Sequence, residues 1–101
     1  METNNLISEV QITPIKPING LVGFASLVLD DNFYLGSIAI MTRPLGGYRL
    51  TYPTRKVGMK NINTYYPINK KIAELVEKTV IKQFEEVMNN QNDRHNEIIT
   101  R

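Results

Sequence analysis

The chain alternates apolar and polar residues through its first half and then changes to a helical period. Its first apolar segment alternates loosely, with Val10 and Ile12 on one face, as a half-buried strand does. The next two segments are rich in β-branched and aromatic residues, which favour strands. The pattern predicts strands over residues 7–16, 21–29, 33–41 and 48–52, with a few more sheet residues at Tyr65 and Tyr66.

Turn chemistry separates these strands. Asn19-Gly20 is typical of a type I′ hairpin turn, because both central residues of that turn need positive φ. Asp30-Asp31-Asn32 predicts a second turn, in which the acids cap local backbone amides. Pro14 and Pro17 remove ladder donors, so the far end of the first strand is expected to lie at a sheet edge or to leave the sheet. Residues 54–64 have no such pattern and predict a flexible basic loop.

The period of the apolar residues changes after Asn69. Their spacing predicts an amphipathic helix over 70–88, and Asn69 is a favourable N-cap, since its side-chain oxygen accepts an N–H of the first turn. Beyond Asn89 the chain is polar and aperiodic, which predicts a disordered tail over 90–101. The apolar face of the helix consists of Ile72, Leu75, Val76, Val80, Phe84, Val87 and Met88.

These elements predict an α+β fold, an antiparallel β-meander of four to five strands packed with a C-terminal α-helix. One domain over 7–89 is expected between a flexible N-terminus, 1–6, and the tail, 90–101. An open sheet of this kind leaves strand edges unpaired, so we expect two copies to form a homodimer through the sheet.

Several classes of chemistry lack their residues. The chain has no cysteine, which excludes disulfides, thiolate metal sites and cysteine nucleophiles. His95 is the only histidine, so neither a histidine-based metal site nor a catalytic triad can form. Gly46-Gly47 is not followed by a P-loop lysine. We therefore predict no enzyme activity, cofactor or metal. No signal peptide or membrane-spanning stretch is visible, which predicts a cytoplasmic protein.

Positive charge is concentrated in one segment. Residues 43–71 hold seven Lys or Arg and no acid, whereas residues 1–42 carry a net charge of −3 and residues 72–101 one of −2. Clustered cations bind nucleic-acid phosphates and interleaved tyrosines stack on bases, but solvated charges and tyrosines packed in a sheet fit the same pattern. Lys70 and Lys71 begin the predicted helix, where free N–H groups would help them hold a phosphate. The candidate nucleic-acid contacts are Arg49, Tyr52, Arg55, Lys56, Lys60, Tyr66, Lys70 and Lys71.

The order of these signals resembles that of the SpoVG (stage V sporulation protein G, or septation protein) family. The resemblance covers roughly residues 7–88. Its most specific pieces are Pro53-Thr54-Arg55-Lys56 and Pro67-Ile68-Asn69, the second of which opens the helix. Tyr66 stands where the family usually has histidine.

The resemblance implies a small bacterial regulator linked to septation, sporulation and cell division. It also implies DNA or RNA binding through Arg55 and Lys56, and dimerisation through the sheet. An alternative function is a non-catalytic protein-interaction regulator of cell division, which would bind an acidic protein partner with the same surface. Both functions depend on charge, so salt dependence alone does not separate them.

Overall fold

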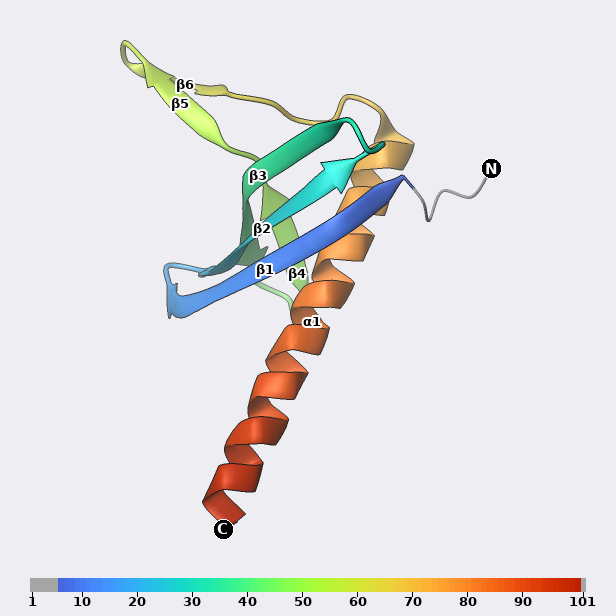
Figure 1. Ribbon diagram of the computed structural model, residues 1–101. Helices are drawn as coiled ribbons and strands as arrows, with labels where there is room; N and C mark the ends of the chain where they lie inside the picture. Colours follow the sequence, from blue (N-terminus) through green and yellow to red (C-terminus); the bar gives the residue numbers. More distant parts are fainter. Residues whose placement is uncertain (1–5, 101) are drawn as a thin grey trace.

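In the computed structural model, four antiparallel strands form one sheet, and a single long helix packs across it (Figure 1). The structure describes residues 6–100, with side chains through residue 90. The four strands are ordered β1-β2-β3-β4, so the predicted α+β meander is confirmed. The elements are β1 (Ile7–Ile18), β2 (Leu21–Leu29), β3 (Phe33–Thr42), β4 (Tyr48–Thr51), β5 (Thr54–Val57), β6 (Lys60–Asn63) and α1 (Lys70–Thr100).

The hairpin between β1 and β2 forms at the predicted turn. Ile18 pairs with Leu21, which leaves Asn19 and Gly20 as a two-residue loop with φ angles of 52° and 88°. Positive φ at both positions is the type I′ geometry that the Asn-Gly pair favours. β1 is an outer strand of the sheet, as the proline at position 14 predicts.

Two β-bulges explain why alternation along β1 and β3 is loose. Glu9 has a φ of 51° and lies where the pairing register of β1 shifts, between Ser8 and Gln11. The residue inserted at the bulge reverses the alternation. Ile7 and Ile12 therefore both pack into the core, although their spacing of five positions would place them on opposite faces of a regular strand. Ser37, with a φ of 59°, marks the corresponding shift in β3.

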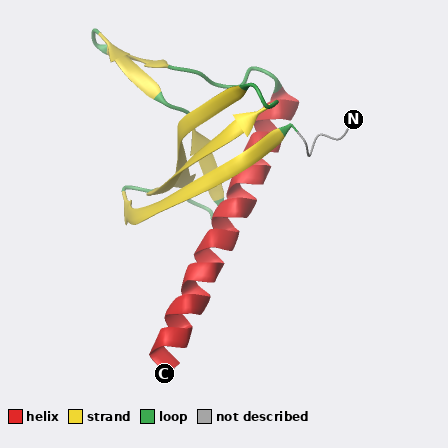
Figure 2. Cartoon of the chain, in the orientation of Figure 1, coloured by secondary structure: helices red, strands yellow, loops and turns green. Residues whose placement is uncertain are grey.

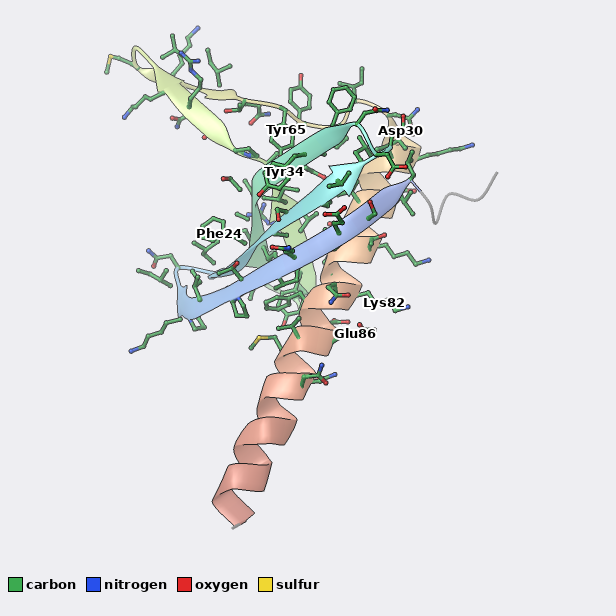
Figure 3. All side chains as sticks on the ribbon, viewed as in Figure 1. Phe24, Asp30, Tyr34, Tyr65, Lys82 and Glu86 are labelled. Atoms are coloured by element: carbon green, nitrogen blue, oxygen red, sulfur yellow. The ribbon has the colours of Figure 1, made fainter. Side chains whose placement is uncertain are left out.

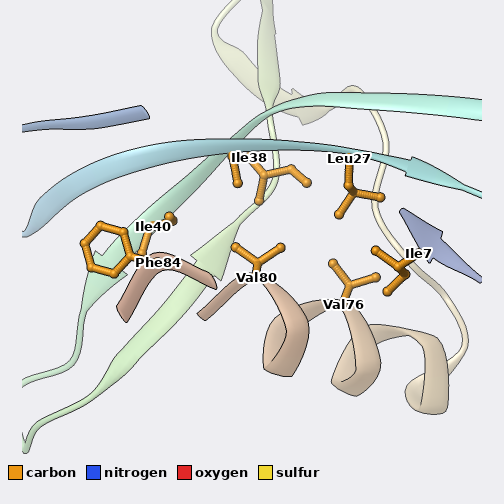
Figure 4. Close-up of a cluster of buried hydrophobic side chains, with 8 residues drawn as sticks. Ile7, Leu27, Ile38, Ile40, Val76, Val80 and Phe84 are labelled. Carbon is orange, nitrogen blue, oxygen red and sulfur yellow. The ribbon is translucent and has the colours of Figure 1, made fainter. Parts of the chain in front are cut away.

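The core lies between α1 and one face of the sheet, as the close-up in Figure 4 shows. Phe84 is 1% exposed, and its ring meets that of Tyr48 edge-on at a centroid distance of 5.1 Å. Each such side chain contributes stability mainly by leaving water. The buried hydrophobic residues are Ile7, Ala25, Leu27, Ile38, Ile40, Val76, Val80 and Phe84.

The helix begins as predicted but ends later. The backbone N–H of Ile72 donates to Asn69 Oδ1 at 3.1 Å, which confirms the N-cap. The predicted end near Met88 is wrong, because α1 continues through Thr100 where the pattern predicts a disordered tail. A helix that is already nucleated gains one hydrogen bond for each residue added, so it extends past its apolar stripe. No helix among the described residues is long and apolar enough to cross a membrane.

Residues 1–5 and 101 lie outside the described residues, as does most of the N-terminus predicted to be flexible. The carbonyl of Leu6 accepts the backbone N–H of Asp30 at 2.6 Å. No strand forms at Tyr65 and Tyr66, where a few sheet residues were expected; the additional strands lie earlier, within the basic segment.

Candidate nucleic-acid interface

The basic segment contains a hairpin that projects from the rest of the molecule. β5 and β6 pair only with each other, and together with their turn they form the arm, residues 54–63 (Figure 2). A hydrogen bond from the Thr64 N–H to the Pro53 carbonyl, 2.8 Å long, closes its base. The prediction of a loop over 54–64 is therefore wrong.

The turn of the arm explains why the sequence pattern did not predict a hairpin. Val57 pairs with Lys60 across a two-residue loop, Gly58-Met59, and only the glycine of that loop has positive φ, 63°. Glycine at the first central position is the type II′ geometry, which carries a weaker signal than Asn-Gly. Every residue of both strands is exposed, so neither strand needs the alternation of apolar and polar residues that identifies a half-buried strand in a sequence.

The cations of the arm lie on both of its faces. Residues paired across two strands share a face, so Arg55 lies beside Ile62 and Lys60 beside Val57 on one face. Lys56 lies beside Asn61 on the other face. Within the part of the chain whose side chains are described, the only ion pair joins Arg43, in the β3–β4 turn, to Glu77 on α1. The arm thus offers its positive charges to solvent without a carboxylate beside them.

The other predicted cations lie elsewhere. Arg49 projects from β4, where its Nη1 donates to Thr51 Oγ1 at 3.0 Å. Lys70 and Lys71 are exposed in the first turn of α1. Figure 1 shows the tip of the arm well separated from the start of the helix. The structure therefore divides the predicted set of cations among the arm, the sheet and the helix start.

The tyrosines of the basic segment differ in exposure. The rings of Tyr52 and Tyr65 meet edge-on at 5.8 Å, and the Tyr65 hydroxyl donates to the Gly36 carbonyl at 2.6 Å. Burial, followed by the charge of Glu77, raises the pKa of Tyr52. Tyr66 is 56% exposed and is the most accessible of them. Tyr52, Tyr65 and Tyr66 line an apolar cleft of about 220 Å³ near the first turns of α1.

Two exposed aromatic residues outside this segment were not predicted as candidates. Phe24 on β2 is 37% exposed and Tyr34 on β3 is 74% exposed; both are labelled in Figure 3. They border a shallow depression of about 390 Å³. Alternation along the strands indicates that Phe24 and Tyr34 lie on the sheet face opposite the core. The position of α1 decides which face of the sheet stays uncovered.

The acids at the β2–β3 turn are exposed. Asp30 and Asp31 both have a φ of 55°, which agrees with the predicted turn. The Asp30 carboxylate accepts from the Asn32 side chain at 3.5 Å, so the expected capping of backbone amides is not what the structure shows. Among the described residues, no three His, Asp or Glu side chains gather in a group that could hold a metal ion.

The comparisons with known proteins agree with the fold. The SpoVG family matches residues 6–86, a range that includes all six strands and most of the helix that packs on the sheet. No curated protein is significantly similar to the chain. The match covers most of the chain and confirms the resemblance carried by Pro53-Thr54-Arg55-Lys56 and Pro67-Ile68-Asn69. The chain therefore belongs to the SpoVG family.

Proposed function

We propose that the protein is a non-catalytic regulator that binds DNA or RNA, with the arm holding the phosphate backbone. The SpoVG family is one of septation- and sporulation-related regulators and not of enzymes. The observation that carries the proposal is the exposure of Arg55, Lys56 and Lys60 on a projecting hairpin with no carboxylate beside them.

Such an arm suits a polyanion. Its cations are exposed and form no ion pair with a described residue, so neutralising phosphates releases condensed counterions from the nucleic acid without first breaking protein ion pairs. Because cations lie on both faces, the arm can contact phosphates on either side of a groove or follow a single strand. Contacts of this type position the protein and carry little sequence information.

Dimerisation is part of the same proposal. β1 and β4 are the outer strands of the sheet, so each leaves one row of backbone groups without a strand partner. Pairing two copies through such an edge would place two arms on one body. Two arms that reach the same strand would bind more tightly than one, because the second contact is intramolecular.

The remaining candidates keep the roles predicted from the sequence. Arg49 lies on β4, and Tyr52 and Tyr66 flank the arm in the sequence, so a strand held by the arm would contact them under this proposal. Lys70 and Lys71 are predicted to add phosphate contacts at the start of α1. Substituting both lysines by alanine should weaken binding and its salt dependence; if neither changes, these two residues are not part of the interface.

The arm is tested by fluorescence-anisotropy titration of short single-stranded and duplex oligonucleotides at two salt concentrations. The variant Arg55→Ala/Lys56→Ala/Lys60→Ala should lose most of its affinity, and the slope of log affinity against log salt should fall by about 3. The control Lys16→Ala/Lys78→Ala/Lys82→Ala removes the same charge from exposed positions outside residues 43–71 and should bind like the wild type.

Two results would contradict the proposal. Equal losses in the arm and control variants would show that net charge, and not the arm, determines binding. A folded wild type that binds no oligonucleotide at low salt would leave the alternative, in which the same surface binds an acidic protein partner.

A further inference from the structure

The sheet has one face that nothing in the described residues covers. Ala25, Leu27, Ile38 and Ile40 point towards α1, so the residues between them point away from it, onto what we call the outer face. The pairing register carries one row of this face across all four strands. That row is Thr13, Phe24, Ala39 and Thr51.

The composition of the outer face is unusual, because the solvated face of a sheet normally carries polar residues. Phe24 and Tyr34 are both exposed there. Tyr34 pairs with Val28, which places it four residues along β2 from Phe24, with Ser26 between them. The depression bordered by the two rings is lined by small polar side chains from three strands. These are Gln11, Thr13, Ser26 and Ser37.

The charge of the outer face favours an anionic ligand. Arg49 pairs with Met41, next to the row that contains Phe24, and so projects onto this face. None of the paired residues on this face is acidic; Glu9 lies in the β1 bulge, outside the paired rows. A surface with two exposed rings, uncharged hydrogen-bonding groups between them and one arginine has the chemistry that recognises unpaired bases.

We propose that the outer face binds single-stranded nucleic acid, with Phe24 and Tyr34 each stacking on a base. Gln11, Ser26 and Ser37 contact base edges in the depression, and Arg49 contacts the backbone. This inference rests on the proposed function, because the arm is what holds the strand near the sheet. Duplex bases are stacked inside the helix and cannot reach the rings, so the outer face adds affinity for single strands alone.

The test compares Tyr34→Ala with Phe33→Ala by fluorescence anisotropy. Phe33 is the neighbouring residue of β3, is 62% exposed and points to the opposite face, so it is a matched control. With a labelled thymidine oligonucleotide, Tyr34→Ala should bind about 5- to 150-fold more weakly than the wild type, and Phe24→Ala/Tyr34→Ala more weakly still. Phe33→Ala should be unchanged, and Tyr34→Phe, which keeps the ring, should bind like the wild type.

A duplex of the same length separates this inference from the function on which it rests. Tyr34→Ala should bind the duplex as the wild type does, whereas the variant of the three arm cations should lose both ligands. If Tyr34→Ala keeps its single-strand affinity while the arm variant loses it, the outer face is not a base-binding surface and the proposed function stands. If the wild type binds neither ligand, both proposals fail.

Sedimentation equilibrium adds the remaining outcome. Tyr34 is 74% exposed, so its substitution should not disturb the monomer fold. If Tyr34→Ala shifts the protein towards monomer and leaves single-strand affinity unchanged, the outer face is an interface between two copies, and the inference is overturned.

Discussion

The body of the molecule, β1–β4 with α1, and the arm use their residues in opposite ways. All the buried hydrophobic side chains among the described residues lie in the body, whereas every residue of β5 and β6 is exposed. The body excludes water from its apolar side chains, and the arm offers Arg55, Lys56 and Lys60 to solvent. An isolated two-stranded hairpin is only marginally stable in water, so the arm contributes little to the stability of the body.

The difference separates stability from binding. Substitutions in the core should change the free energy of unfolding and leave the interface chemistry intact. Substitutions of exposed arm residues should do the reverse, because surface changes alter stability by less than about 0.5 kcal/mol.

The largest expected effect is that of Phe84→Ala in the body. Phe84 is 1% exposed and packs edge-on against Tyr48, so truncation leaves a cavity and should lower the free energy of unfolding by about 3–5 kcal/mol. Urea denaturation followed by circular dichroism measures this loss. Leu45→Ala, at a fully exposed position in the β3–β4 turn, is the control and should change stability by less than about 0.5 kcal/mol.

The binding of the same variant sharpens the comparison. At a temperature where Phe84→Ala is still folded, its oligonucleotide affinity should equal that of the wild type. A folded variant with much weaker binding would show that the two regions are coupled.

The next effect is that of Gly58→Ala in the arm. The glycine has a φ of 63°, where an alanine costs about 1–2 kcal/mol, so the hairpin should open. NMR should show weaker cross-strand contacts between Lys56 and Asn61, while the urea midpoint of the whole protein stays unchanged. Met59→Ala is the control, since Met59 is 97% exposed and does not have positive φ. An equal fall in global stability would mean that the arm unfolds together with the body.

The body was more predictable from the sequence than the arm, because the body buries its apolar side chains and the arm does not. In the body, local signals agree with the tertiary structure: Asn19-Gly20 has the predicted turn geometry, Asn69 caps the helix, and Phe84 lies on the predicted apolar face. The bulges at Glu9 and Ser37 could not be predicted, because each appears in the sequence only as a break in alternation. Their effect on pairing is a property of two strands and not of one.

The candidate site was predictable in its residue types and not in its geometry. The concentration of charge in residues 43–71 located the cations, but a solvated hairpin has no apolar face, so nothing distinguished the arm from a loop. Phe24 and Tyr34 were not identified, because strand residues of this kind are usually buried. Only the position of α1 shows which face of the sheet is open.

The smallest effect is expected from Tyr65→Phe, at the junction of the two regions. Tyr65 lies two residues beyond the arm, and its hydroxyl donates to the Gly36 carbonyl at 2.6 Å. Losing that bond should cost about 0.5–1.5 kcal/mol of global stability at neutral pH, measured by urea denaturation. If stability is unchanged, the segment after the arm is not anchored to the body.

The pH dependence of the same variant identifies the cause. Burial, followed by the nearby Tyr52 and Tyr34, raises the pKa of Tyr65 from 10.0 to about 12. Tyr65 therefore ionises at a lower pH in the unfolded chain than in the folded one. Its contribution to stability is complete below pH 10 and is lost as the pH rises towards 12. Tyr65→Phe should lose less stability than the wild type across this window, while the contribution of Tyr52 is common to both proteins. Parallel pH profiles would show that Tyr65 is not held by the body. A shallower pH profile for Tyr65→Phe would show that Tyr65 unfolds with the core. An unchanged urea midpoint in Gly58→Ala would show that residue 58 does not. Together, these two results would place the boundary between arm and body at the end of β6.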